Sequence, residues 1–251
     1  VRAPNLGELF TPATVGLTNL GVDPCAGAQT PAQVTADNPL NPNLADANFR
    51  AICLAQGAPL GTIGLIENPT AGQANILAGG NTALKPETAK TWTLGVVFVP
   101  DFLPRFSMSV DYYNIRIKDV IGTALPGDLI NACFGVPNAS GIYPVTGTTA
   151  ADPDCVIIGG NPATGGLDGD PSTTQGLFGL TTNLGELFTD GIDLIANYKT
   201  GVGFGDLALS FVGNWTMNSE YNANVNSDDS FFRECAGRYS VNCSFTGSIQ
   251  P

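Results

Sequence analysis

Residues 81–121 decide the fold, and their sequence is NTALKPETAKTWTLGVVFVPDFLPRFSMSVDYYNIRIKDVI. From Thr91 to Val99 large apolar side chains alternate with smaller or more polar ones, and the alternation resumes at Phe106. A period of two in aromatic and β-branched residues is typical of half-buried β-strands. The intervening segment contains Pro100 and Pro104, and proline ends strands because it has no backbone N–H to donate. The stretch therefore predicts two long strands joined by a tight turn, over about 88–100 and 106–121.

The composition favours an all-β protein. Charged residues make up 13% of the 251-residue chain, against roughly 25% in a typical globular protein, while hydrophobic residues make up 43%. No window holds the roughly 18 consecutive apolar residues of a transmembrane helix. A transmembrane strand, in contrast, needs only about 9–11 residues of alternating pattern, so a membrane location stays open.

The charge balance argues against nucleic acid and against an enzyme. The formal net charge is −12, and the ten basic residues are scattered, whereas phosphate binding needs clustered Lys and Arg. The chain has no histidine, which removes the commonest general base and a common metal ligand. Asp168, Asp170, Asp228 and Asp229 lack the spacing of a calcium-binding loop, so we interpret them as solvated loop residues. We expect no catalytic residues, no metal site and no cofactor.

The order of long and short connections points to a membrane protein. A second pair of strands is predicted over about 186–199 and 206–219, joined by a short glycine-rich turn. Both short turns lie at one end of the strand array, and the long polar segments 11–80, 122–185 and 220–247 lie at the other. A transmembrane β-barrel has this asymmetry, with short periplasmic turns and long external loops. We therefore predict an antiparallel transmembrane β-barrel segment, with residues 1–251 as part of one barrel domain.

The six cysteines are distributed two to each long segment. The even number and the absence of a C-x-x-C motif favour disulfides formed in an oxidising compartment, with free thiols in a reducing compartment as the alternative. Placing one bond in each loop predicts the pairs Cys25–Cys53, Cys133–Cys155 and Cys235–Cys243.

Several local features carry weaker expectations. Residues 1–10 look like a strand end or a short turn, and residues 44–56 have near-helical spacing of apolar side chains. The apolar parity changes at Tyr112–Tyr113, which either a β-bulge or a strand leaving one environment for another would explain. The heptapeptide NLGELFT occurs at 5–11 and again at 183–189, which we interpret as two similar strand ends.

Four segments, in order, resemble the barrel of TonB-dependent outer-membrane receptors. They are R-A-P-x-L-x-E-L at 2–9, N-x-x-L-K-P-E at 81–87 with Gly95 following, D-Y-Y-x-I-x-I-x-D-x-I at 111–121, and G-I-D at 191–193. The resemblance implies a 22-stranded barrel with an N-terminal plug, located in the bacterial outer membrane and importing a scarce ligand. Siderophore chelates, cobalamin and oligosaccharides are the ligand classes that it implies.

The chain departs from this pattern, because it shows no plug, no energy-coupling box and no closing strand with an aromatic end. We therefore expect an internal-to-late barrel segment of a longer receptor. Its expected partners are outer-membrane lipid, the plug and the other barrel strands, and a TonB-type energy-coupling protein acting through the remainder of the receptor.

Aromatic and arginine side chains in the loops are the expected ligand contacts, because these residue types dominate recognition energetics. The candidates are Tyr143, Phe178, Phe231, Phe232, Arg233, Arg238 and Tyr239. The rival hypothesis is a secreted, disulfide-bonded β-domain that acts as an adhesin or a carbohydrate-binding module. It predicts that the strand faces meet in a dry core, whereas a barrel wall directs Leu94, Phe98, Leu207 and Phe211 outward to lipid.

Overall fold

The computed structural model describes residues 1–27, 41–144, 149–152, 154–156, 158–222, 232–238 and 243. They form two compact units. Unit 1 contains Val1–Ala3, Lys85–Val120 and the described residues from Asn183 onward, and unit 2 contains Pro4–Leu84 and Ile121–Thr182. None of the helices among the described residues is long and apolar enough to cross a membrane.

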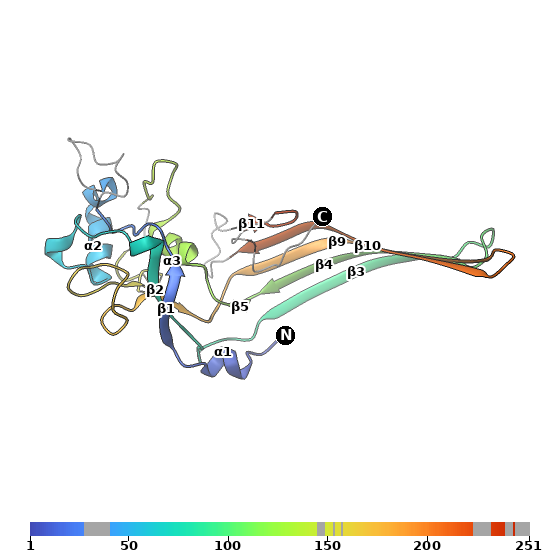
Figure 1. Ribbon diagram of the computed structural model, residues 1–251, viewed down its shortest axis with the longest axis horizontal. Helices are drawn as coiled ribbons and strands as arrows, with labels where there is room; N and C mark the ends of the chain where they lie inside the picture. The colour runs from blue at the N-terminus through green and yellow to red at the C-terminus, as the bar shows by residue number, and fades with distance from the viewer. Residues whose placement is uncertain are drawn as a thin grey trace. The chain divides into compact units, whose positions relative to one another are not determined.

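Unit 1 is an antiparallel sheet with the strand order β11-β10-β9-β4-β3. Figure 1 shows β3, β4, β9 and β10 side by side as long ribbons. Among the described strands β3 and β11 lie at the two edges, so the sheet is open. The strands are β3 (Thr88–Phe98), β4 (Phe106–Lys118), β9 (Glu186–Gly201), β10 (Asp206–Asn222) and β11 (Phe232–Glu234).

The four long strands occupy the ranges in which the sequence alternates, but their ends differ from the expected ones. β9 and β10 continue to Gly201 and Asn222, because their mutual backbone ladder persists after the side-chain alternation stops. β4 ends at Lys118 instead of near Ile121. The next residue, Asp119, has a φ of 55°, and this left-handed conformation interrupts an extended chain.

The parity change at Tyr112–Tyr113 is not a β-bulge. Both ladders of β4 keep one register through these residues, with Tyr112 opposite Leu94 on one side and Ile192 on the other. A register shift is present instead in β10, between Thr216 and Asn218. The bulge interpretation is therefore wrong, and a change of environment along the strand is left to explain the parity.

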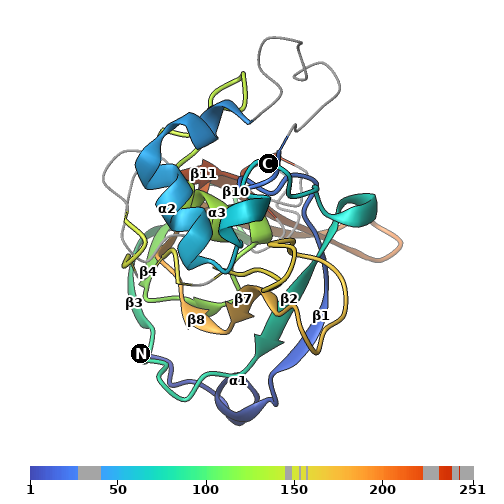
Figure 2. The same ribbon diagram turned by 90° about the vertical axis from the view of Figure 1, so that its left-hand side faces the viewer.

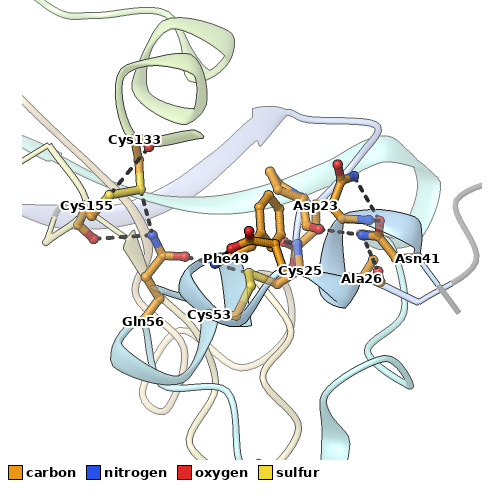
Figure 3. Close-up of a disulfide and its surroundings, with 12 residues drawn as sticks. Asp23, Cys25, Ala26, Asn41, Phe49, Cys53, Gln56, Cys133 and Cys155 are labelled. Carbon is orange, nitrogen blue, oxygen red and sulfur yellow. Dashed lines mark hydrogen bonds between the residues drawn. A yellow bond between two sulfur atoms is a disulfide. The ribbon is translucent and has the colours of Figure 1, made fainter. Parts of the chain in front are cut away.

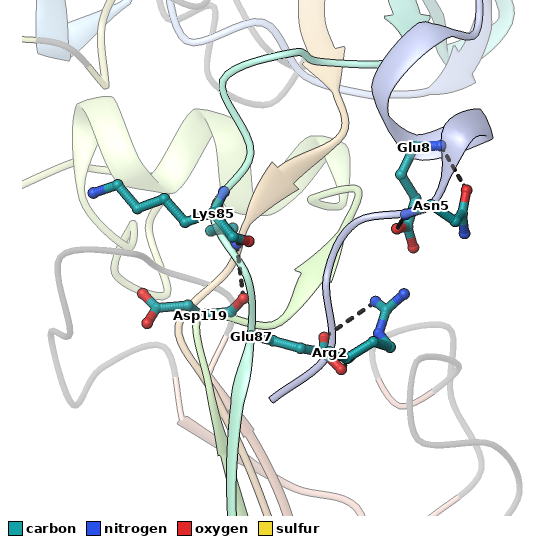
Figure 4. Close-up of polar contacts among 7 residues, drawn as sticks. Arg2, Asn5, Glu8, Lys85, Glu87 and Asp119 are labelled. Atoms are coloured by element: carbon teal, nitrogen blue, oxygen red, sulfur yellow. Dashed lines mark hydrogen bonds and ion pairs between the residues drawn. The ribbon is translucent and has the colours of Figure 1, made fainter.

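The first residues form two contacts that the sequence did not indicate (Figure 4). Arg2 and Glu87 form an antiparallel bridge, and the Arg2 guanidinium also binds the Glu87 carboxylate through Nε–Oε1 at 2.7 Å and Nη2–Oε2 at 3.1 Å. Helix α1 (Leu6–Phe10) then begins with a capping box, in which Asn5 Oδ1 accepts from the Glu8 amide and Glu8 Oε2 accepts from the Asn5 amide.

The repeated heptapeptide therefore adopts two structures. At 5–11 it caps and forms α1, whereas at 183–189 its last residues begin strand β9. In the second copy the Asn183 amide accepts from Lys85 N and donates to the carbonyls of Lys85 and Asp119, at 2.8 Å in each case. The interpretation as two similar strand ends is wrong, because the partners of the Asn side chain differ between the two copies.

Unit 2 is more ordered than its poor periodicity suggests (Figure 2). Its sheet has the order β1-β2-β7-β6, in which β2 and β7 run parallel and the other pairs run antiparallel. Helix α2 occupies part of the segment with near-helical spacing, and α3 was not expected. The helices are α2 (Ala47–Ala55) and α3 (Pro126–Phe134), with 3-10 turns η1 (Pro42–Ala45), η2 (Leu60–Thr62) and η3 (Thr70–Gly72). The strands are β1 (Thr14–Asn19), β2 (Gln73–Gly79), β6 (Ile158–Gly159) and β7 (Gly176–Leu180), and the two-residue strands β5 (Ile121–Gly122) and β8 (Thr182–Asn183) follow β4 and precede β9.

An aromatic cluster forms the centre of unit 2. Phe49 of α2 and Phe134 of α3 have ring centroids 4.8 Å apart, and Tyr143 packs against both at 6.1 and 5.8 Å. Both phenylalanines are fully buried. Tilted aromatic pairs of this kind add roughly 0.5–1.5 kcal/mol beyond the area that they bury.

Replacing Gly176 by alanine should destabilise unit 2. Gly176 has a φ of 73°, and a Cβ there would overlap the Asn75 carbonyl oxygen of the neighbouring strand β2. The left-handed conformation alone costs a non-glycine residue roughly 1–2 kcal/mol. We expect Gly176→Ala to lower the protection of β2 and β7 amides against hydrogen exchange by at least about 2 kcal/mol. Gly16→Ala is the matched control, because no atom lies within 4 Å of its added Cβ, and equal protection in the two variants would contradict the prediction.

Candidate functional site

One face of the unit 1 sheet is apolar across four strands, and we call it the apolar face. The cross-strand register places Leu94, Tyr112, Ile192 and Trp215 in a single row on it. Leu94 is 68% exposed and Phe211 57% exposed, so these side chains have no covering layer within the described residues. The face consists of Trp92, Leu94, Val96, Phe98, Phe106, Met108, Val110, Tyr112, Ile192, Leu194, Ala196, Tyr198, Leu207, Leu209, Phe211 and Trp215.

This exposure decides between the two sequence-based hypotheses. A soluble β-domain requires Leu94, Phe98, Leu207 and Phe211 to meet in a dry core, and all four are exposed. Monomeric soluble proteins rarely expose contiguous apolar patches beyond a few hundred Å², and larger ones mark contact with protein or membrane. The apolar face is therefore suited to contact with a membrane or another protein surface and not with water.

Aromatic side chains mark both ends of the apolar face. Phe106 and Tyr198 are cross-strand neighbours near the short turns. At the other end Trp92 and Tyr112 have ring centroids 5.0 Å apart, and Trp215 lies in the Tyr112 row. Along β10 the apolar face runs from Leu207 to Trp215, close to the roughly 9–11 residues of a transmembrane strand.

The opposite face, which we call the polar face, carries a row that crosses the same four strands. The row consists of Gly95, Asp111, Asp193 and Asn214. A Cβ on Gly95 would overlap the Asp111 carboxylate, so the glycine makes room for that side chain. Asn214 Nδ2 donates to Asp193 Oδ1 at 2.7 Å and to the Tyr113 hydroxyl at 3.2 Å. These hydrogen-bonded polar groups are suited to water and not to lipid.

The two faces exchange character beyond Tyr112, toward the ends of the strands remote from the short turns. On the side of the apolar face, Arg116 and Lys118 follow, with Arg116 Nη1 at 3.1 Å and Lys118 Nζ at 3.9 Å from the Glu186 carboxylate. The Arg116 guanidinium also lies 5.3 Å from the Phe188 ring centroid, within cation–π range. On the opposite side Ile115 and Ile117 succeed Tyr113. The parity change is therefore an exchange of environments within an uninterrupted ladder.

The structure contains the three predicted disulfides, Cys25–Cys53, Cys133–Cys155 and Cys235–Cys243. The first two lie in unit 2 and close loops with sequence separations of 28 and 22 residues. By loop entropy each would stabilise the folded chain by roughly 3–4 kcal/mol. All six cysteine side chains are buried.

A buried glutamine joins the two disulfides of unit 2 (Figure 3). Gln56 Nε2 donates to Cys133 Sγ at 3.4 Å and to the Cys155 carbonyl at 3.3 Å. Its Oε1 lies 3.8 Å from Cys25 Sγ, which is a contact and not a hydrogen bond because an oxidised sulfur carries no proton. Gln56 follows α2 directly, so it ties this helix to the loop that contains Cys155.

Two titratable groups are buried near the first disulfide. Burial raises the pKa of Asp23 to about 7, and the Asp168 carboxylate adds to the shift against the opposing hydrogen bond from the Cys25 amide. Burial also raises the pKa of the Tyr143 phenol to about 12, with a contribution from Asp23. In the sequence, the dipeptide Asp23-Pro24 is a signal for a turn, but not for burial of the carboxyl group.

Two predicted ligand-binding residues lie in unit 2. Tyr143 is 8% exposed and packs in the aromatic cluster, which leaves little of its ring for a ligand. Phe178 is half-buried on β7, with its ring over Gly159 of β6. Of these two candidates, Phe178 is therefore the one that lies partly at the surface.

The other candidates lie in the third long segment. Arg233 is half-buried on β11 opposite Tyr221, and Arg238 is exposed after a turn in which its amide donates to the Cys235 carbonyl. Phe232 is the first residue of β11. Phe231 and Tyr239 lie outside the described residues.

Two of the acidic loop residues, Asp168 and Asp170, have structural partners, whereas Asp228 and Asp229 lie outside the described residues. Asp168 Oδ2 accepts from the Thr70 amide at 2.8 Å. Asp170 Oδ1 accepts from the Ser172 amide at 2.8 Å, and this hydrogen bond lowers the pKa of Asp170. Across the described part of the chain, no group of three or more acidic or cysteine side chains is placed to hold a metal ion.

The match to a protein-family model agrees with this geometry. A model of the family "TonB dependent receptor-like, beta-barrel" matches residues 1–234. No curated protein matches the chain. Among solved structures, the crystal structure of the siderophore receptor PirA from Pseudomonas aeruginosa is similar at 13% identity and a TM-score of 0.26, covering 60% of this chain and 21% of PirA. The chain thus spans about a fifth of that receptor's length. Because the family match extends over nearly all of its 251 residues, the chain belongs to the TonB-dependent receptor-like β-barrel family.

Proposed function

We propose that this chain is part of the wall and of the external loop layer of a bacterial outer-membrane receptor that imports a scarce ligand. The observation that carries the proposal is the apolar face, which continues across four hydrogen-bonded strands opposite a polar face. A transmembrane barrel requires this alternation, with lipid outside and water inside. Family membership supports transport and not catalysis as the activity of the whole receptor.

The proposed orientation follows from the connections and the charges. The short turns 99–105 and 202–205 lie on the periplasmic side, and segments 11–80, 122–185 and 220–247 lie outside, all within one barrel domain. Lys90, Arg116 and Lys118 follow the aromatic residues at the external end of the apolar face, where lipid headgroups would surround them. The division into two units is compatible with one domain, because segments of unit 1 and unit 2 alternate along the chain.

Unit 2 has features that suit a domain segment exposed outside the cell. Its two disulfides suit an oxidising compartment, and its aromatic cluster provides a core that lipid need not complete. We propose Phe178, Arg233 and Arg238 as ligand contacts, together with Phe231, Phe232 and Tyr239. The ligand belongs to the siderophore, cobalamin or oligosaccharide class, and import further requires the plug, the remaining strands and a TonB-type energy-coupling protein.

An arginine on the apolar face should block assembly of the wall, whereas one on the polar face should not. Val96→Arg directs a charge into lipid between the two aromatic ends of the apolar face, at a cost of roughly 2–4 kcal/mol near the bilayer centre. Val97→Arg is the matched control, since it is the next residue along β3 and lies on the polar face. We expect only Val96→Arg to reduce the fraction of full-length receptor that resists unfolding in detergent before heating. Equal losses in the two variants would contradict the assignment of the faces.

Import itself is tested with three chemically distinct probes. Cells that lack the receptor are supplied with the full-length protein and offered a ferric siderophore, cyanocobalamin or a maltooligosaccharide, each radiolabelled. We expect accumulation of one class, which stops when a protonophore collapses the inner-membrane potential. Failure of all three, with folded receptor present in the outer membrane, would overturn the proposed function.

The ligand contacts are tested by binding of the probe that accumulates. Phe178→Ala and Arg238→Ala should each weaken binding about 10-fold, the effect typical of an interface anchor. Leu60→Ala, an exposed apolar residue of unit 2 outside the proposed contacts, should leave affinity unchanged. An equal effect of all three substitutions would argue against these contacts.

A further inference from the structure

Asp23 is a buried carboxylic acid in a turn of unit 2, and the function proposed above does not involve it. Its side chain is 3% exposed. Oδ1 accepts from the Cys25 amide at 2.8 Å, the backbone amide of Asp23 donates to Asn68 Oδ1 at 3.0 Å, and its carbonyl accepts from the Ala26 amide at 3.0 Å. Every polar atom of this residue except one therefore has a defined role in closing the turn.

The exception is Oδ2, which is buried and has no hydrogen-bond partner among the described residues. The titratable groups that face Asp23 are the Asp168 carboxylate, from the segment before β7, and the Tyr143 phenol, which follows α3. Neither group offers a positive charge. An ionised carboxylate at this position is therefore both desolvated and repelled, which is the costliest way to bury an acid.

The turn that contains Asp23 holds several segments of unit 2 together (Figure 3). Asn41 Nδ2 donates to the carbonyls of Pro24 and Ala26, at 2.6 and 2.9 Å. The Gly27 amide donates to the Ile66 carbonyl at 2.7 Å. The Cys25–Cys53 disulfide links the turn covalently to α2. Opening of residues 21–27 would release the noncovalent contacts while the disulfide keeps the turn attached.

We propose that Asp23 is a proton-binding latch: with a proton on its carboxyl group it holds turn 21–27 closed against residues 41–45 and 66–68, and loss of that proton loosens the turn. The proton leaves Oδ2 for solvent water, and the negative charge that remains is stabilised only when the carboxylate reaches water. The latch is a property of unit 2 alone, so it does not depend on which ligand the receptor takes.

The pH range of the latch follows from the two protonation states. Asp23 has a pKa of about 7 in the closed turn, against an ordinary value of 3.8 when it is exposed to water. The closed turn therefore retains a proton that the open turn has already lost, and closing weakens as the pH rises from about 4 to about 7. Below this range the stabilisation is complete, and above it closing no longer depends on pH. Between pH 5 and pH 8 the closing equilibrium should fall on the order of 10- to 100-fold.

Hydrogen exchange of the turn amides in the full-length receptor tests the latch. Protection of Cys25, Ala26 and Gly27, corrected for intrinsic exchange, should fall 10- to 100-fold between pH 5 and pH 8 in the wild type. Asp23→Asn, which mimics the protonated acid, should remain protected throughout. Asp170→Asn, at an exposed carboxylate of unit 2 whose pKa is already low, should retain the wild-type pH dependence.

A second variant covers the case in which Asp23→Asn does not fold. Asp168→Asn removes the repelling charge and should shift the loss of protection to lower pH. Infrared spectra should also show a protonated carboxyl band that persists toward pH 7 in the wild type. Protection independent of pH in the wild type, or an unchanged pH profile in either Asp23→Asn or Asp168→Asn, would overturn the proposal.

Discussion

The structure of unit 1 depends on an antiparallel backbone ladder from β3 to β10, which keeps one register across the apolar face and shifts in β10 between Thr216 and Asn218. Because side chains in a strand alternate between two faces, one register shared by four strands determines which residues are neighbours on each face. A slip of one residue in β4 would place Asp111 among Leu94, Ile192 and Trp215. The same ladder pairs the backbone amides and carbonyls of the central strands, which a hydrocarbon environment requires. The register therefore determines both which side chains lie on each face of the sheet and how the backbone groups are paired.

The exchange of faces beyond Tyr112 shows that the ladder is longer than the apolar face. β4 and β9 remain paired up to Lys118 and Glu186, well past the last apolar row. The sheet therefore continues beyond the apolar face with its polar and apolar sides exchanged. At this end of the sheet the Asn183 side-chain amide bonds to the backbones of Lys85 and Asp119, and so joins the residues just before β3, just after β4 and before β9.

The sequence predicted what depends on local periodicity and missed what depends on particular partners. The alternation of apolar and polar side chains predicted the long strands. Pairing each cysteine with the other cysteine of the same loop predicted the disulfides. Helix α3 and the sheet of unit 2 were missed, because their short elements have no repeating pattern of side chains. Helix α3 packs instead through Phe134 against Phe49 of α2, a contact between residues far apart in the sequence. The two copies of NLGELFT illustrate this difference. The first copy forms helix α1, where the Asn5 side chain caps the Glu8 amide. The second copy enters strand β9, and its Asn183 side chain bonds to the backbones of Lys85 and Asp119. For the candidate site, residue type suggested Tyr143, and burial in the aromatic cluster could be known only from the fold.

The arrangement of the disulfides has a consequence for how the protein matures. Six cysteines allow 15 pairings, yet here each cysteine bonds to the next one along the chain. An oxidase that joins thiols in the order in which they emerge from export would produce the native set directly. Maturation of this chain therefore has no inherent need for an isomerase to rearrange mispaired bonds. The cysteine order therefore lets export itself guide the oxidation of this chain.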